Sequence, residues 1–225
     1  MSLDVVFFDV GNTLVFPDQD KTLAPLWKRG IRPTESQLFA AERVARQETD
    51  LLISRTRKVD QQYWETYYSH LLRSLGISDV SLRLEMVSLA RTSSNWSRIR
   101  PGTMEFLGRM KSKYRLGVIS NSDGHMAERL ASLGFGPCFE HVIDSGAVGY
   151  EKPAPQIFQA AVDAMSVAAE RTLYLGDIYS VDFLGAQNAG MKAMLMDVAG
   201  VYANRNLPRV ESLEEFESKI AELER

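Results

Sequence analysis

Acidic, hydroxyl, amide and basic side chains occur in a set order along this 225-residue chain, each just after a short apolar run. The residues are Asp9, Ser120 with Asn121, Lys152, and Asp177 with Asp182. Singly, each has a simple structural explanation as a turn residue, a helix cap or a solvated loop lysine. Those explanations do not account for their order. In one pocket, three carboxylates and one ammonium would sum to −2, and a Mg²⁺ ion, which prefers oxygen ligands, would neutralise them.

The apolar runs that precede these residues are predicted to be buried strands, because they are rich in β-branched and aromatic residues and end at turn residues. They are residues 4–10, 116–120, 172–175 and 193–196, with a further strand around 142–143. Helical patterns lie between or after them, at 101–113, 125–133, 155–168, 180–189 and 211–223. This alternation predicts an α/β fold, a Rossmann-like parallel sheet core with helices on both faces. Ligands of such sheets bind outside the carboxyl ends of the strands, where the polar residues fall.

Residues 17–97 interrupt the alternation. Apolar residues recur there at helical spacing, and the stretch 34–75 contains neither Gly nor Pro. The pattern predicts about four helices and no strand over 21–95. Because this segment lies between the first strand and the next helix of the α/β unit, we expect an inserted α-helical domain at 17–97. The α/β core would then comprise 1–16 and 98–225.

Taken together, the polar residues resemble the four signatures of the haloacid dehalogenase-like (HAD) hydrolase superfamily, in its branch with a helical cap after the first strand. The first signature, Asp-x-Asp-x-Thr, is similar to Asp9-Val-Gly-Asn-Thr13 except at its third position. The second, a strand ending in Ser or Thr, matches Ser120 with Asn121. The third is a Lys often followed by Pro, and the fourth is Gly-Asp with another Asp a few residues on; they match Lys152-Pro153 and Gly176-Asp177 with Asp182. The resemblance covers almost the whole chain, although the cap matches only in position and helicity.

The resemblance implies a Mg²⁺-dependent hydrolase, and a phosphatase on a small phosphorylated metabolite is the interpretation we favour. Asp9 would be the nucleophile, forming an aspartyl-phosphate that splits the reaction into two easier steps. The resemblance also implies three metal ligands: Asp9, the main-chain carbonyl of Gly11 and the carboxylate of Asp177.

The same resemblance assigns the phosphoryl-binding groups. Ser120 and the Asn121 amide would hold phosphoryl oxygens. Lys152 would pair with Asp9 and with the phosphoryl charge, which it would stabilise in the transition state. Asp182 would support Lys152, or would contact the metal's ligands without binding the metal itself. Thr13 would be a further supporting residue.

Gly11 departs from the pattern, because the phosphatases of this family carry there the Asp that protonates the leaving group and activates water. A Gly keeps the main-chain carbonyl but cannot transfer a proton, so turnover is expected to be slow unless another group substitutes. Asp123 and His125 are candidate substitutes, although loop polarity explains them equally well.

Two alternatives to a phosphatase therefore stay open. One is a 2-haloacid dehalogenase-type hydrolase, which attacks carbon without a metal; the pair Asp177 and Asp182 argues against it. The other is a catalytically weakened HAD-like binding or regulatory protein, which the retained Asp9 and Lys152 oppose.

Two clusters in the helical segment invite functional interpretations. Tyr63, Trp64, Tyr67 and Tyr68 could stack on a substrate, but their 63/67 and 64/68 spacings favour the interior of the cap. Arg55, Arg57 and Lys58 could steer an anion, but a solvated helix end is the interpretation we prefer.

Composition narrows the class of protein further. Hydrophobic residues make up 45% and charged residues 24%, as in ordinary globular proteins. The net charge is −3, which gives no general attraction to nucleic acid. A single cysteine, Cys138, fits a reducing compartment, and the sequence predicts neither a signal peptide nor a membrane-spanning segment. We expect a cytoplasmic protein, a monomer or homodimer, with a small phosphate substrate and no nucleic-acid or membrane partner.

Overall fold

The structure is a computed structural model that describes residues 3–56 and 63–223. The chain divides into two compact units. One comprises residues 1–14, 99–198 and 206–225, and the other comprises 15–98 and 199–205. The first is called the sheet unit below and the second the helical unit. The short stretch 199–205 lies far along the sequence from the rest of the helical unit.

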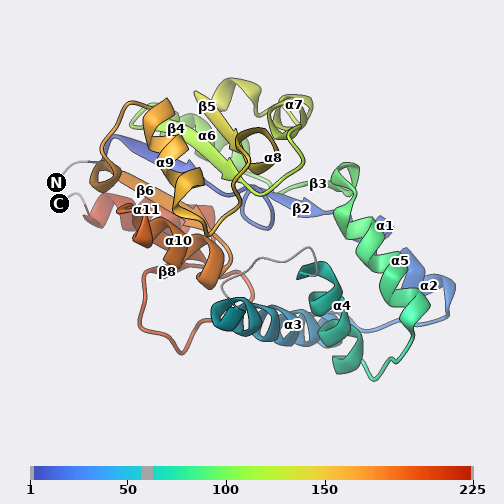
Figure 1. Cartoon of the computed structure of the whole chain (residues 1–225). Helices are drawn as coiled ribbons and strands as arrows, with labels where there is room; N and C mark the ends of the chain where they lie inside the picture. The colour runs from blue at the N-terminus through green and yellow to red at the C-terminus, as the bar shows by residue number, and fades with distance from the viewer. Residues whose placement is uncertain (1–2, 57–62, 224–225) are drawn as a thin grey trace. The chain divides into compact units, whose positions relative to one another are not determined.

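A six-stranded sheet forms the centre of the sheet unit (Figure 1). The strand order is β5-β4-β1-β6-β7-β8. Its neighbouring strands pair in parallel. The strands are β1 (Val5–Phe8), β4 (Arg115–Ser120), β5 (His141–Asp144), β6 (Thr172–Gly176), β7 (Lys192–Met196) and β8 (Arg209–Val210). The predicted parallel α/β fold is confirmed. The sequence did not indicate β8, which is only two residues long.

Helices cover both faces of this sheet. They are α6 (Thr103–Lys111), α7 (Met126–Ser132), α8 (Ser145–Val148), α9 (Pro155–Ala164), α10 (Leu184–Asn188) and α11 (Leu213–Leu223), and a π-helical turn (Tyr179–Phe183) leads into α10. Shorter 3-10 turns lie at Gly136–Cys138 and Ala169–Arg171.

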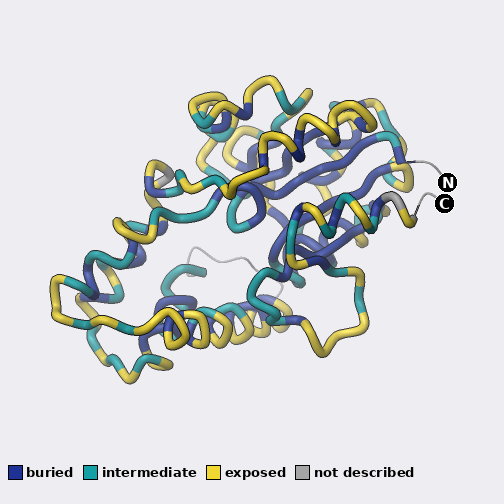
Figure 2. The backbone as a smooth tube through the Cα atoms, turned by 180° about the vertical axis from the view of Figure 1, so that it is seen from behind, coloured by how far each residue is buried: buried dark blue, intermediate teal, exposed yellow. Residues whose placement is uncertain are grey.

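Side chains alternate between the faces along each strand, and this alternation places the helices. Phe8 packs edge-on against Phe106 of α6 and Phe216 of α11, with ring centroids 6.0 Å apart in both pairs. Tyr174 of β6 is paired in register with the residue before Phe8, so it faces the other side. There it packs against Phe158 of α9 at 5.5 Å. The central strands are buried along their lengths, while the helices alternate buried and exposed residues (Figure 2).

Helices make up most of the helical unit. Its elements are β2 (Val15–Pro17), α1 (Gln19–Thr22), α2 (Ala24–Lys28), α3 (Glu35–Thr56), α4 (Tyr63–Ser74), α5 (Val80–Arg91), a 3-10 turn (Ser93–Asn95) and β3 (Trp96–Ile99), whose last residue belongs to the sheet unit. The strands β2 and β3, at either end of the helical run, form a two-stranded sheet that the sequence did not suggest. Asp79 caps the start of α5, because its carboxylate accepts the N–H of Leu82 at 3.0 Å.

The aromatic cluster belongs to the interior of the helical unit. Tyr67 and Tyr68 are buried in its apolar core, and Tyr63 and Trp64 pack against that core. Neighbouring rings lie 4.9 to 6.4 Å apart between centroids. This arrangement agrees with the packing interpretation of the 63/67 and 64/68 spacings. Arg55 is exposed in the last turn of α3, whereas Arg57 and Lys58 lie outside the described residues.

Candidate active site

The carboxyl edge of the sheet gathers the acidic residues that the sequence singled out. Asp9 directly follows β1, and its N–H donates to the carbonyl of Leu175 in the neighbouring strand at 2.8 Å. Ser120 ends β4 on the other side of β1, and Asp177 follows β6. All three are buried. Parallel strands thus bring residues more than 100 positions apart to one edge, as the sequence predicts.

Lys152 lies at the centre of this edge, with 2% of its surface exposed. Its Nζ donates to Asp9 Oδ1 at 2.7 Å, to Asp182 Oδ1 at 2.7 Å and to the hydroxyl of Tyr174 at 2.8 Å. The other oxygen of Asp182 accepts the N–H of Ile178 at 2.9 Å. A buried ammonium needs such partners, because an unpaired buried charge is strongly destabilising. The three acceptors match the three protons of the ammonium group.

Asp9, Asp177 and Asp182 form a buried acidic cluster in which one ligand oxygen from each lies within 4.8 Å of the others. Both oxygens of Asp182 are already engaged, with Lys152 and with the main chain. Asp9 and Asp177 are therefore the two carboxylates of the cluster that are best suited to hold a metal ion. Carboxylate oxygens are the ligands that hard divalent cations prefer.

The charges of this site shift its protonation equilibria. Burial raises the pKa of Asp9 from 3.8 to about 7, even though Lys152 opposes the shift; Asp182 and Asp177 add to it. Burial alone would lower the pKa of Lys152, but Asp182 and Asp9 together raise it above its ordinary value. Lys152 is thus held as a cation. The ionised form of Asp9 is disfavoured by burial and by the neighbouring carboxylates of Asp182 and Asp177. A bound cation would favour the ionised form of Asp9.

Asn121 is joined to the main chain of Lys152 by two hydrogen bonds. Its Nδ2 donates to the Lys152 carbonyl at 3.0 Å, and its Oδ1 accepts the Lys152 N–H at 2.7 Å. The Asn121 side chain thereby fixes the loop that carries Lys152, a contact that the motif gives no means of predicting. The expected role of the Asn121 amide at the phosphoryl group stays a prediction.

Asp144, which ends β5, holds the loop that follows Ser120. Its carboxylate accepts the N–H groups of Gly124, Met126 and Gly146 at 2.9 to 3.0 Å. Sequence reasoning missed this residue, although a signal existed, since it is another carboxylate at the end of a strand. Tyr174 was also missed. Its signal is a hydroxyl in the middle of an otherwise apolar strand.

The turn after Asp9 carries the unusual Gly11. Leu14 closes this turn by donating its N–H to the carbonyl of Val10 at 2.9 Å. Thr13 is 1% exposed, and its hydroxyl has no hydrogen-bond partner among the described residues.

The two candidate substitutes for the missing acid lie on the loop after β4. Asp123 is exposed, and its carboxylate accepts the N–H of His125 at 3.3 Å. The His125 side chain is 72% exposed, and its Nδ1 lies 3.2 Å from Glu128. Both contacts are those of ordinary loop residues, and neither joins these side chains to Asp9.

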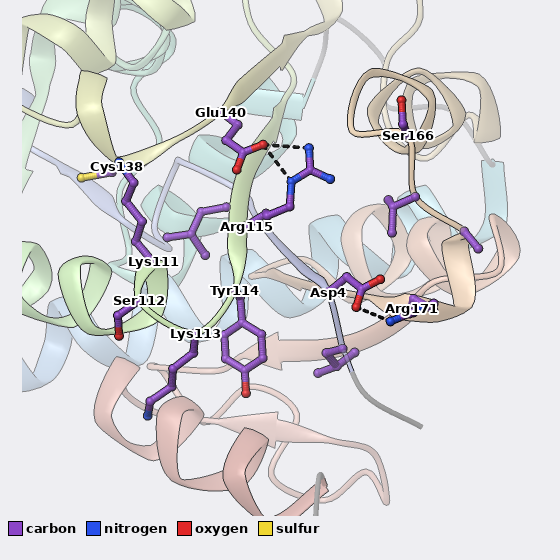
Figure 3. A pocket seen from close by; sticks show the side chains of 14 residues that line it. Asp4, Lys111, Ser112, Lys113, Tyr114, Arg115, Cys138, Glu140, Ser166 and Arg171 are labelled. Carbon is purple, nitrogen blue, oxygen red and sulfur yellow. Dashed lines mark hydrogen bonds and ion pairs between the residues drawn. The ribbon is translucent and has the colours of Figure 1, made fainter.

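A hollow of about 620 Å³ lies at the opposite, amino-terminal edge of the sheet (Figure 3). Two ion pairs line it: Arg115 with Glu140, and Arg171 with Asp4. Lys111 donates to the carbonyl of Pro137 at 2.5 Å. Because none of the acidic cluster lines this hollow, we place the candidate active site at the carboxyl edge.

Comparisons with known proteins agree with this fold. The family model for haloacid dehalogenase-like hydrolases matches residues 3–190. A glyceraldehyde 3-phosphate phosphatase from Methanothermobacter thermautotrophicus is 29% identical over 91% of this chain and 90% of its own. One from Pyrococcus abyssi is 31% identical over 85% of this chain and 80% of its own. The chain therefore belongs to the haloacid dehalogenase-like hydrolase family, and it is an enzyme of the hydrolase class.

Among solved structures, the HAD-hydrolase YfnB from Bacillus subtilis aligns with a TM-score of 0.68 at 19% identity, over 98% of this chain and 99% of its own. This likeness supports the fold. None of the helices in the described part of the chain has the length and apolar character needed to cross a bilayer.

Proposed function

We propose that this protein is a Mg²⁺-dependent phosphatase that hydrolyses a small phosphorylated metabolite through an aspartyl-phosphate at Asp9. The observation that carries the proposal is the buried group of Asp9, Lys152 and Asp182, beside Asp177, at the carboxyl edge of the sheet. Relatives named as glyceraldehyde 3-phosphate phosphatases, which align over most of the chain, support phosphate ester as the substrate class.

The donor set fits Mg²⁺. Asp9 and Asp177 supply carboxylate oxygens from neighbouring strand ends, and the main-chain carbonyl of Gly11, two residues after Asp9, would complete the protein's contribution. With Lys152 included, the three carboxylates leave a charge of −2 in the site, which would repel a phosphate dianion. When bound, Mg²⁺ supplies charge neutralisation and orients phosphoryl oxygens.

The protein's own groups divide the reaction into two displacements. In the first, a carboxylate oxygen of Asp9 forms a bond to phosphorus as the ester P–O bond breaks, and the alcohol leaves with a proton from water. In the second, water attacks the same phosphorus, the bond to Asp9 breaks and inorganic phosphate is released, while the proton lost by the attacking water neutralises the hydroxide left in the solvent by the first step. Lys152 stabilises the phosphoryl charge throughout, and Ser120 holds a phosphoryl oxygen.

Gly11 provides no acid to protonate the leaving alcohol and no base to activate water. We therefore expect good leaving groups, such as aryl phosphates, to react faster than alkyl phosphates. A dehalogenase would need no cation, so the buried acidic cluster favours the phosphatase over it.

The helical segment 17–97 is proposed to be the cap that determines which phosphate ester is accepted, since the core signatures are shared across many substrates of the family. Because the fold is a poor guide to the particular reaction, the metabolite itself has to come from a screen. The proposal also includes a cytoplasmic location.

A phosphate-release screen tests the proposed function. The wild-type enzyme, Asp9→Asn and the surface control Asp163→Asn are assayed with Mg²⁺ on a panel of phosphorylated metabolites and an aryl phosphate. We expect release by the wild type and by Asp163→Asn, and none by Asp9→Asn. Equal residual rates in the wild type and Asp9→Asn would exclude the mechanism. Halide release from a 2-haloacid without metal would favour a dehalogenase instead.

A further inference from the structure

Tyr174 is a fully buried tyrosine whose hydroxyl lies among the charged groups of the site. It accepts a hydrogen bond from Lys152 Nζ at 2.8 Å. Its single proton has two acceptors, Asp182 Oδ1 at 3.0 Å and the main-chain carbonyl of Ile119 at 3.2 Å. Lys152, Tyr174 and Asp182 therefore form a closed triangle of hydrogen bonds. None of the four sequence signatures includes this residue.

The strand β6 explains why a tyrosine can reach this point. Tyr174 and Gly176 share the face covered by α9, because side chains alternate along a strand. A Cβ on Gly176 would lie 2.5 Å from Cγ of Asp182, so the absence of a side chain there leaves room for that carboxylate beside the tyrosine. Phe158 of α9 packs edge-on against the Tyr174 ring and limits its movement.

The contacts of Lys152 give the hydroxyl a defined role. An ammonium group has three protons, and here two go to carboxylates while the third goes to Tyr174. Without the hydroxyl, one N–H of a buried cation would lose its acceptor, a loss that is costly in a site of low dielectric. The ammonium could then turn or shift to find another partner, and its alignment with Asp9 would change.

We propose that Tyr174 is a positioning residue for the reaction: its hydroxyl fixes the third N–H of Lys152 and so holds the ammonium in line with Asp9. The inference rests on the proposed function, because it concerns the contribution of Tyr174 to kcat of the proposed phosphatase reaction. Lys152 acts chiefly on the charge that moves during phosphoryl transfer. Loss of its alignment should therefore lower kcat and leave substrate binding largely unchanged.

The experiment compares the wild type, Tyr174→Phe and Tyr114→Phe with Mg²⁺ and an aryl phosphate. Tyr114 is a matched control, because it is also a buried tyrosine of the sheet unit but lines the hollow at the opposite edge (Figure 3). We expect Tyr174→Phe to lower kcat on the order of tenfold, with KM changed less than about twofold. Tyr114→Phe should keep the wild-type kcat.

A second variant separates positioning from packing and remains informative if Tyr174→Phe does not fold. Placing 4-aminophenylalanine at position 174 keeps the ring, the size of the group and a donor toward Ile119, but it removes a good acceptor for Lys152. We expect a fall in kcat similar to that of Tyr174→Phe. A wild-type kcat in this variant, or in folded Tyr174→Phe, would overturn the inference. Failure of the proposed function is a different result, since the wild type and Asp9→Asn would then release phosphate at the same rate.

Discussion

Replacing Asp9 by Asn is expected to remove a pH-dependent loss of stability from the metal-free protein, together with its nucleophile. Because burial raises the pKa of Asp9 from 3.8 to about 7, the folded protein binds this proton more tightly than the unfolded chain. The stability that Asp9 contributes is fully present below pH 3.8 and is lost as the pH rises to about 7. Asn is permanently neutral and avoids this loss.

The size of the effect follows from the shift of about three pKa units, each of which corresponds to about 1.4 kcal/mol. By the linkage relation, ionisation of Asp9 lowers the free energy of unfolding of the wild type by about 2 kcal/mol at pH 5 and about 4 kcal/mol at pH 8, relative to the protonated form, and Asp9→Asn does not undergo this loss. Urea unfolding between pH 5 and pH 8 in the presence of a chelator measures this difference. Circular dichroism is the suitable signal, because the tryptophans Trp27, Trp64 and Trp96 all belong to the helical unit.

Two comparisons make this test specific. Asp163→Asn removes the same charge at an exposed position of α9, and it should show no such dependence on pH. Saturating Mg²⁺ should stabilise the wild type at pH 8 and have little effect on Asp9→Asn, because a ligand stabilises the state that it binds. If the wild type and Asp9→Asn respond alike to pH in the chelator, the reasoning about the buried acidic cluster is wrong.

Three further variants test other parts of the site. In steady-state assays, Gly11→Asp should raise kcat at least tenfold, and the gain should be larger for an alkyl phosphate than for an aryl phosphate. A folded, Mg²⁺-binding variant without this gain would show that the missing acid does not limit turnover. Gly176→Ala should push Asp182 aside and lower the free energy of unfolding by about 1–3 kcal/mol, whereas Gly108→Ala, which has open space around it, should not; equal unfolding midpoints would contradict the close contact. Asp144→Asn removes one of the two carboxylate oxygens that accept N–H groups of the loop after β4, and it should raise the inhibition constant for orthovanadate several-fold. An unchanged inhibition constant would show that this loop does not contribute to phosphoryl binding.

Much of the fold follows from the sequence because the strands are apolar runs that end at turn residues. β1, β4, β6 and β7 lie where the runs predict them, and the parallel order follows from the helices between them. β8 has only two residues, too few for a periodic pattern. The pairing of β2 with β3 joins residues about 80 positions apart, and no local signal in the sequence encodes that pairing.

The candidate site was predictable to the extent that it consists of charged residues at strand ends. The contact of Lys152 with Asp9 and Asp182 agrees with expectation. The contributions of Tyr174 and Asn121 were not predictable, since each depends on the three-dimensional route of the Lys152 loop. A tyrosine in an apolar strand is more often a packing residue than a partner for a buried cation.

Trapping the covalent intermediate tests the central claim most directly. The enzyme is mixed with Mg²⁺ and a ³²P-labelled phosphate ester that it turns over, quenched with acid within one turnover, digested and mapped by mass spectrometry. We predict a label on the peptide containing Asp9 that hydroxylamine removes, and no label in Asp9→Asn. Phosphate release by the wild type with no label at Asp9, or with the label on another residue, would contradict the account.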